Sequence, residues 1–153
     1  MNFRQITYGS QEYERAWALR EEVLRAPLGL SLRDENLAPE KNQLHFGLFE
    51  PDGTLVACVI AVPLAAGQVK IRQVAVAPAR QRMGLGSKIM GELERTLVAR
   101  GFHRFVLHAR VAVVGFYRKL GYVVVGDEFE EVTIPHVRME KTVLSRHETE
   151  KRF

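Results

Sequence analysis

The chain reads Val69-Lys-Ile-Arg-Gln-Val-Ala-Val-Ala-Pro78, then Ala79-Arg-Gln-Arg-Met-Gly84-Leu-Gly86-Ser-Lys88, and then continues from Ile89 to Gly101. The first segment is rich in β-branched residues and is closed by a proline, which predicts a strand. The third has apolar residues at the spacing of one helical face and a glycine at its end, which predicts a helix. Glycines between a strand and a helix let backbone N–H groups approach an anion, which the helix dipole also attracts. The stretch therefore predicts a phosphate-binding turn and a phosphorylated cofactor.

Two common phosphate-binding motifs fit this turn poorly. A P-loop needs a glycine, four other residues and then Gly-Lys-Ser/Thr, but Gly86 is followed by Ser87 and Lys88. A dinucleotide-binding turn needs a third glycine where Ile89 stands, and an acidic residue after the next strand, which here ends beside Arg110. Since Arg110 at best favours a 2′-phosphate, an NADP-dependent oxidoreductase is kept as an alternative.

A third phosphate-binding motif matches the turn. Gln81-Arg-Met-Gly84-Leu-Gly86 has the form Gln-x-x-Gly-x-Gly, and it resembles the pyrophosphate-binding motif of the GNAT superfamily of N-acetyltransferases, which use acetyl-coenzyme A. Further along, Gly115-Phe-Tyr-Arg-Lys-Leu-Gly-Tyr122 is similar to that family's Phe-Tyr-x-Lys-x-Gly-Phe element. The resemblance covers residues 2–142. It implies the GNAT fold, an α/β (α+β) domain with a twisted, mixed, mostly antiparallel sheet flanked by helices.

Length and composition are those of one small globular enzyme. The chain has 153 residues, of which 46% are hydrophobic and 26% charged. This suits a single domain, which we place at residues 1–144, with a polar tail at 145–153. No apolar run reaches the ~18 residues of a membrane helix, and the first residues lack the pattern of a secretion signal. The single cysteine, Cys58, lies in an apolar run and predicts a buried residue in a reducing compartment. We therefore expect a cytoplasmic protein without a membrane partner.

The net charge of +4 has an ordinary explanation. Lysines and arginines are scattered among acids, with no basic helix, and a basic pI alone is an unspecific sign of nucleic-acid binding. Part of the positive charge lies near the turn, at Lys70, Arg72, Arg80, Arg82 and Lys88. This placement suits a cofactor with several phosphates, so we expect no nucleic-acid partner.

The N-terminal part is predicted to contain a strand, a helix and a long loop. The strand covers 2–8 and the helix 11–25, for which Ser10 is an N-cap candidate. No capping box is expected, because Tyr13 stands three residues on. An apolar stripe on this helix predicts core contacts for Tyr13, Ala16, Trp17, Leu19, Val23 and Leu24. Residues 26–43 are predicted to form a loop, and long loops in compact domains are often functional.

The rest of the chain is predicted to be mostly strands. Two of them, at 45–50 and 54–63, are joined by the hairpin turn Pro51-Asp-Gly53, and a second turn near 65–68 leads into the strand before the glycine turn. After the long helix we expect a strand at 104–109, a short helix at 113–120, and strands at 122–125 and 136–141.

The GNAT resemblance implies which residues hold acetyl-coenzyme A. Backbone N–H groups of the turn bind the pyrophosphate, and Gln81 and Arg82 add side-chain contacts. The strand before the turn pairs with the pantetheine arm, and a backbone N–H near Val76 polarises the thioester carbonyl, aimed by a distortion of the strand at Ala75. The implied cofactor-binding set is Val74, Ala75, Val76, Gln81, Arg82, Met83, Gly84, Leu85, Gly86, Ser87, His108, Phe116, Tyr117 and Lys119.

The same resemblance implies direct transfer of an acetyl group to a primary amine in a ternary complex. Tyr117 stands where the family commonly protonates the leaving thiolate, and the unperturbed pKa values of phenol and thiol lie within about two units. The alternative is that the Tyr117 ring only packs beside Phe116. Glu131 and His136 are candidate bases for an ammonium substrate, and His108, at a strand end, is a third.

The segment after Phe129 supports a narrower resemblance, to an ElaA-like branch of the superfamily. That branch has a Phe-x-Glu-x-Gly-Ile-Pro-His element, which Phe129, Glu131, Ile134, Pro135 and His136 match, and Arg25, Pro27, Leu28 and Gly29 also look like it. Thr133 stands where the element has glycine. Because threonine resists a positive φ, we expect the loop before Ile134 to have a different geometry.

Several alternatives stay open at this point. The acidic run 127–131 could attract a cationic amine without any proton transfer, and the histidines and glutamates could be ordinary structural residues. We expect no metal site, because no second cysteine is present and ligand-like spacing is missing among His45, His103, His108, His136 and His147. A coenzyme A-binding regulatory module without transferase activity is the alternative function. The acceptor is left open among small amines, amino sugars, polyamines, peptides and protein lysines, and a homodimer is an ordinary arrangement for such an enzyme.

Overall fold

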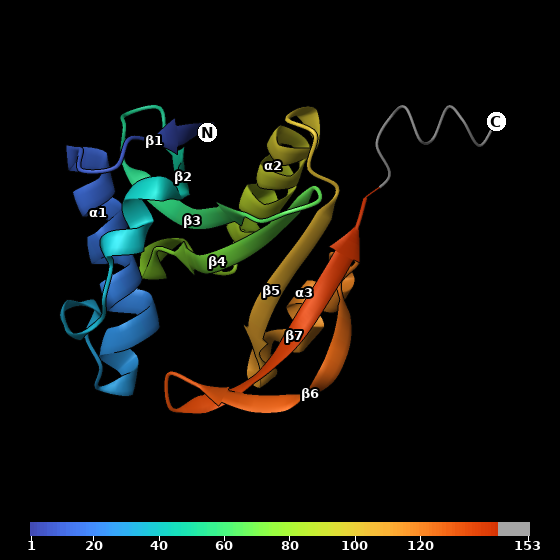
Figure 1. Cartoon of the computed structure of the whole chain (residues 1–153). Coiled ribbons are helices and arrows are strands. Elements are labelled where there is room, and N and C mark those ends of the chain that lie inside the picture. Colours follow the sequence, from blue (N-terminus) through green and yellow to red (C-terminus); the bar gives the residue numbers. More distant parts are fainter. Residues whose placement is uncertain (144–153) are drawn as a thin grey trace. The chain divides into compact units, whose positions relative to one another are not determined.

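The structure is a computed structural model, and it describes residues 1–143. Its strands form a seven-stranded sheet in the order β1-β2-β3-β4-β5-β7-β6 (Figure 1). The strands are β1 Asn2–Ile6, β2 Leu44–Phe49, β3 Leu55–Pro63, β4 Gln68–Val76, β5 Arg104–Arg110, β6 Val123–Glu131 and β7 Ile134–Thr142. β4 and β5 pair in parallel, whereas β1–β2, β2–β3, β5–β7 and β6–β7 pair antiparallel. The expected mixed, mostly antiparallel sheet is confirmed.

The helices are α1 Gln11–Arg20, α2 Leu85–Ala99 and α3 Val114–Lys119. The helix predicted at 11–25 is confirmed in its extent, but its last turn, Glu21–Arg25, is π-helical. The predicted loop 26–43 contains three short 3₁₀ turns, and two more precede the other helices: Ala26–Leu28, Leu32–Asp34, Ala38–Asn42, Pro78–Arg80 and Val111–Val113.

One strand prediction was too short. The strand predicted at 122–125 continues to Glu131, because a register shift between Val125 and Phe129 lets β6 rejoin its partner β7. Gly126, which has a φ of 83°, and the acidic residues after it look like a strand end when read alone. The continuation brings Glu131 opposite Ile134.

The described chain divides into two compact units. Unit 1 comprises Met1–Val62 and Arg72–Glu94, and unit 2 comprises Pro63–Ile71 and the chain from Arg95 on. β4 and α2 each contribute residues to both units.

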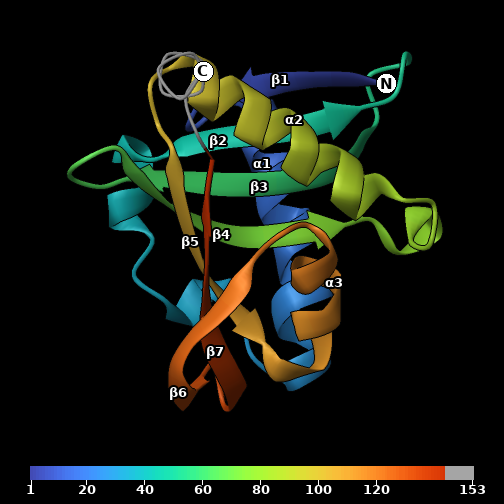
Figure 2. The same ribbon diagram turned by 90° about the vertical axis from the view of Figure 1, so that its right-hand side faces the viewer.

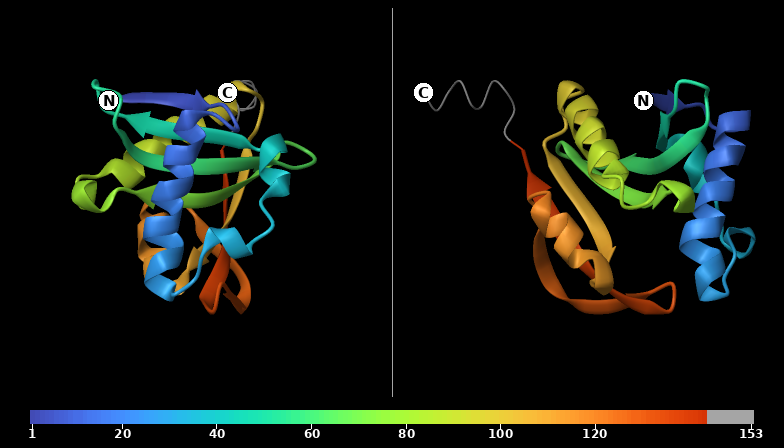
Figure 3. Two further views of the ribbon diagram at one scale, coloured as in Figure 1. Left: turned by 90° about the vertical axis from the view of Figure 1, so that its left-hand side faces the viewer. Right: turned by 180° about the vertical axis from the view of Figure 1, so that it is seen from behind.

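In unit 1, helix α1 crosses one face of the strands β1–β3 (Figure 3, left). Ser10 caps the helix by accepting a hydrogen bond from the backbone N–H of Tyr13, as predicted. The apolar stripe of α1 enters a core made of Ile6, Tyr13, Ala16, Leu19, Phe49, Cys58 and Ala75, and Val23 and Leu24 pack against it. Trp17 does not belong to this core; it is partly buried and lies under the guanidinium of Arg33.

In unit 2, the strands β5, β7 and β6 lie side by side, with α3 beside them (Figure 2). Alternate residues of a strand point to opposite faces. Phe105, Leu107 and Ala109 of β5 are buried on one face. The register places His108 opposite Arg138 and Arg110 opposite His136, so the other face of these strands is polar.

No helix in residues 1–143 is long and apolar enough to cross a membrane. Cys58 is fully buried in unit 1, as predicted, and burial raises the pKa of its thiol to about 12. The tail predicted at 145–153 lies outside the described residues.

Candidate functional site

The glycine turn of unit 1 has the backbone geometry of an anion cradle. Arg82 and Gly84 both have positive φ, at 66° and 75°, and α2 begins at the next residue, Leu85. The N–H of Lys88 donates to the carbonyl of Gly84, which closes the first turn of the helix. The N–H groups before Lys88 therefore have no partner within the helix. They point, with the positive end of the helix dipole, out of the N-terminus of α2.

The surroundings of the turn leave room for an anion. The residues Gln81 to Gly84 are exposed, and a Cβ placed on Gly84 would meet no atom within 4 Å. Arg80 is ion-paired with Glu50, while Arg82 and Lys88 are exposed on the turn and the first turn of α2. These features fit a pyrophosphate group. The side-chain amide of Gln81 donates to the carbonyl of Val76 at 3.2 Å, so it closes the turn onto the end of β4.

The distortion of β4 lies two residues earlier than predicted. Gln73, not Ala75, has the unusual backbone, with a φ of 56°, whereas Ala75 is buried in the core of unit 1. The carbonyl oxygen of the Gln73 side chain accepts a hydrogen bond of 2.6 Å from Arg20 Nε. A polar contact from α1 therefore holds the distorted position, which sequence analysis had no local signal to locate.

Arg20 belongs to a buried polar cluster that sequence analysis missed. Its guanidinium binds both oxygens of Glu40, at 3.0 and 2.6 Å, and Tyr13 Oη donates to the same carboxylate at 2.7 Å. His45 Nε2 lies 2.8 Å from the backbone carbonyl of Glu40. The side chains of Arg20 and Glu40 are only 1% and 2% exposed. The cluster thus connects the loop, α1 and β4 within unit 1.

The protonation of this cluster follows from burial and hydrogen bonding. Burial alone would raise the pKa of Glu40, but hydrogen bonds from Arg20 and Tyr13 outweigh it and hold the pKa of the carboxyl below its usual value. Burial, together with the Glu40 carboxylate, raises the pKa of Tyr13. Burial lowers the pKa of His45. Near neutral pH the cluster therefore contains an ionised carboxylate, a protonated phenol and a neutral imidazole.

Tyr117 lies on α3 in unit 2. Its ring makes edge-on contacts with the rings of Phe116 and Tyr122. The centroid of Tyr117 lies 5.0 Å from that of Phe116 and 5.9 Å from that of Tyr122. Burial raises the pKa of Tyr117 to about 12, although the charge of Arg110 opposes the shift. The phenol is therefore protonated over the whole working range of pH. Lys119, the last residue of the same helix, is exposed.

Three of the predicted polar residues meet on the polar face of unit 2. His108 Nδ1 lies 3.0 Å from Glu131 Oε1, and His136 Nε2 lies 3.7 Å from Glu131 Oε2. His136 Nδ1 is 2.9 Å from the carbonyl of Ile134. The ring of Phe129 lies between the two imidazoles, edge-on to His108 at 4.9 Å and stacked with His136 at 6.2 Å.

The two histidines hold Glu131 in its ionised form. Partial burial would raise the pKa of its carboxyl, but the hydrogen bond from His108, followed by the charges of His108, His136 and Lys70, lowers it below the usual value. His108 and Glu131 are 25% and 43% exposed, whereas His136 is 4% exposed. Only the first two of the three side chains are therefore accessible to a solute.

The turn between β6 and β7 contradicts the expectation for Thr133. Val132 and Thr133 have φ values of 45° and 69°, so the chain adopts the positive φ that a β-branched residue resists. Positive φ at both central residues is typical of a type I′ turn, which here joins Glu131 to its partner Ile134. The turn next to Glu131 is therefore strained, and the geometry implied by the ElaA-like element is kept without its glycine.

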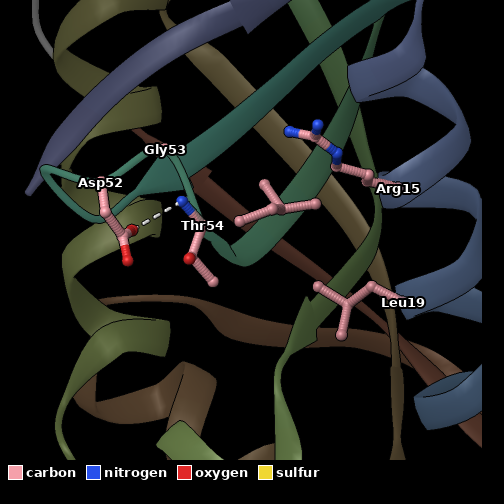
Figure 4. Close-up of a pocket in the computed structure, with 6 residues that line it drawn as sticks. Arg15, Leu19, Asp52, Gly53 and Thr54 are labelled. Carbon is pink, nitrogen blue, oxygen red and sulfur yellow. Dashed lines mark hydrogen bonds between the residues drawn. The ribbon is translucent and has the colours of Figure 1, made fainter.

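A separate pocket of about 410 Å³ lies in unit 1 and contains none of the residues predicted to bind the cofactor or to act in catalysis. It is lined by Arg15, Leu19, Asp52, Gly53, Thr54 and Leu55 (Figure 4). The carboxylate of Asp52 accepts a hydrogen bond from the backbone N–H of Thr54, which stabilises the hairpin turn. Within residues 1–143, no group of three or more His, Cys, Asp or Glu side chains is arranged to hold a metal ion.

Comparison with known proteins supplies the family. The profile described as "Acetyltransferase (GNAT) domain" matches residues 30–143. The chain belongs to the GNAT acetyltransferase family. A protein of Bacillus subtilis (strain 168), named as a candidate acetyltransferase, is 30% identical over 92% of this chain and 96% of its own length.

Solved GNAT structures share the fold. Escherichia coli ElaA has a TM-score of 0.78 at 21% identity, with 92% of this chain and 99% of the other covered. An aminoglycoside 6′-N-acetyltransferase complexed with coenzyme A has a TM-score of 0.74 at 18% identity, with 95% and 99% covered. The predicted GNAT fold and the likeness to ElaA are thus confirmed, and coenzyme A is the ligand of a structure with this fold.

Proposed function

We propose that this GNAT protein transfers an acetyl group from acetyl-coenzyme A to a primary amine, directly and within a ternary complex. The observation that carries the proposal is the glycine turn. Its positive φ values at Arg82 and Gly84, the open space beside Gly84 and the N-terminus of α2 fit a pyrophosphate. Membership of the GNAT family supports the same ligand.

Acetyl-coenzyme A, when bound, supplies an activated acyl thioester. The backbone N–H groups of Arg82 to Ser87 would bind its phosphates, with the side chains of Arg82 and Lys88 adding positive charge. The strand residues Val74 to Val76 would hydrogen-bond the peptide-like arm. Gln81 has a structural role in this scheme, because its amide already binds the Val76 carbonyl.

Tyr117 is the proposed proton donor to the leaving thiolate. Its raised pKa, about 12, keeps the phenol in its protonated form, which is the form that can donate. A free thiolate, with a conjugate-acid pKa near 8.5, is a weak base for such a donor. Burial therefore makes proton transfer from Tyr117 less favourable than transfer from a free phenol, and the Tyr117→Phe variant tests whether the transfer occurs.

Ligand binding tests the cofactor assignment. A saturating ligand at about 100 times its Kd stabilises a protein by about 2.7 kcal/mol, which for this size raises Tm by roughly 5–10 °C. We expect acetyl-coenzyme A to raise Tm by this amount, and NADP(H) to leave it unchanged. A shift with NADP(H) alone would favour the oxidoreductase alternative.

Two glycine variants make that test specific to the turn. Gly84 and Gly9 both have positive φ, 75° and 79°, and neither Cβ would meet an atom within 4 Å. Gly84→Ala and Gly9→Ala should therefore lose similar stability, roughly 1–2 kcal/mol. Only Gly84→Ala should lose the shift caused by acetyl-coenzyme A. Equal shifts in the two variants would remove the turn from cofactor binding.

A further inference from the structure

The polar face of unit 2 distinguishes the roles of His108, Glu131 and His136. We propose that His108 is the general base that accepts the proton of the ammonium substrate, and that Glu131 is a positioning residue which orients His108 and balances its charge. This inference rests on the proposed acetyltransferase function. It assigns one base where the sequence left three candidates.

The contact with Glu131 fixes the tautomer of His108. Its Nδ1 lies 3.0 Å from Glu131 Oε1. An ionised carboxylate only accepts hydrogen bonds, so Nδ1 carries the proton in the neutral ring and Nε2 carries the lone pair. The free lone pair is the part of the ring that a base uses. A carboxylate on the opposite nitrogen also stabilises the imidazolium once Nε2 is protonated.

The two histidines differ in their exposure to solvent. His136 is buried, and both of its ring nitrogens face oxygen atoms, the carbonyl of Ile134 at 2.9 Å and Glu131 Oε2 at 3.7 Å. Burial therefore closes the His136 ring to a substrate. His108 is six times more exposed, 25% against 4%, and only its Nδ1 is engaged in the contact with Glu131. The two histidines lie near different oxygens of Glu131, His108 near Oε1 and His136 near Oε2.

Neighbouring structure holds both His108 and the end of β6 that carries Glu131. The edge-on contact with Phe129 fixes the His108 ring, and the strained turn at Val132 and Thr133 fixes the end of β6 that carries Glu131. Strain of this kind persists only where surrounding structure imposes it, and it concentrates at functional sites.

Other charged groups also lie on the strands next to His108: Lys70 on β4, and Arg138, paired with Glu140, on β7.

The proton balance of the reaction needs such a base. An ammonium R–NH₃⁺ loses two protons when it becomes the amide R–NH–CO–CH₃. One passes through His108 Nε2 to solvent, and this frees the nitrogen lone pair that forms the new carbon–nitrogen bond. The nitrogen loses the other proton as the carbon–sulfur bond breaks; Tyr117 protonates the leaving thiolate to the free thiol, and this second proton restores the phenol. The sum is one amide, one free thiol and one proton released.

Kinetics of matched variants test the proposal. With any amine that the wild-type acetylates, His108→Gln should lower kcat by about 10²–10⁴-fold and leave the KM for acetyl-coenzyme A within about threefold. His103→Gln, at a histidine that packs over the turn at Gly67, is the matched control and should keep the wild-type rate. A His108→Gln rate within about threefold of wild-type, or a larger loss in His136→Gln, would overturn the proposal.

A spectroscopic readout tests the positioning role without turnover. The ¹⁵N shifts of the histidine rings should report the Nδ1–H tautomer for His108 in the wild-type. Glu131→Ala should abolish this preference, and Glu131→Gln, which keeps an acceptor oxygen, should restore the tautomer but not the rate. An Nε2–H tautomer in the wild-type would contradict the proposal. If the wild-type acetylates no amine while the tautomer is as expected, the proposed function fails and the geometric assignment stands.

Discussion

Replacing Glu40 by alanine should destabilise the protein more than any exposed substitution. The change leaves the Arg20 guanidinium, 1% exposed, without its counter-charge. It also removes two hydrogen bonds from Arg20 and one from Tyr13. Breaking a buried ion pair from one side typically costs about 3–5 kcal/mol. Because Arg20 keeps its contact with Gln73, we expect about 4 kcal/mol, or a Tm lower by roughly 10 °C.

Urea unfolding monitored by circular dichroism measures this loss, with the slope m compared between variants to confirm two-state behaviour. Glu140→Ala, which breaks the exposed pair with Arg138, is the control and should lose less than about 1 kcal/mol. The double variant Arg20→Met/Glu40→Met should recover more than half of the loss, because no buried charge is left unpaired. A loss below about 1 kcal/mol in Glu40→Ala would refute the reasoning.

Three further predictions concern strain, pH and burial. Val132→Asn combined with Thr133→Gly should raise the free energy of unfolding by about 1–2 kcal/mol, since these residues accept positive φ; an unchanged value in urea would contradict the strain. Folding lowers the pKa of Glu40, so its contribution to stability is present above the usual pKa of 4.5 and is lost as the pH falls below it. The wild-type should therefore have a higher unfolding free energy than Glu40→Gln at pH 5, and this difference should shrink as the pH decreases from about 5 to 3. A difference that stays constant over this range would contradict the prediction. Cys58, with its pKa raised to about 12, should react with a thiol reagent only after denaturation, and rapid labelling of the native protein would show that it is not buried.

Features that depend on neighbouring residues could be predicted from the sequence. Ser10 caps α1, and Gly101 ends the last turn after α2 with a φ of 97°. Gly53 closes the hairpin turn with a bond from its N–H to the carbonyl of Glu50. Each of these contacts joins residues at most a few positions apart. These helix ends and turns could therefore be predicted, because contacts between residues close in sequence determine them.

Features that depend on distant residues could not be predicted. Glu40 is a charged residue in a segment without periodicity, and nothing nearby indicates that Arg20 and Tyr13 bury it. The distortion at Gln73 is held by a residue 53 positions away. Tertiary pairing also overrode the reluctance of Thr133 to adopt positive φ. His108, Glu131 and His136 could be predicted from the sequence as candidate bases. Only their contacts in the folded protein distinguish their roles.

The release of free coenzyme A tests the central claim most directly. The wild-type protein is incubated with acetyl-coenzyme A and a panel of small amines, amino sugars, polyamines and lysine peptides, with an acetyl-coenzyme A control for hydrolysis. We predict release above the control with at least one primary amine, and a loss of that release of about 10²–10⁴-fold in Tyr117→Phe if the phenol protonates the thiolate. Binding of acetyl-coenzyme A without release on any amine would contradict the claim and favour a regulatory module.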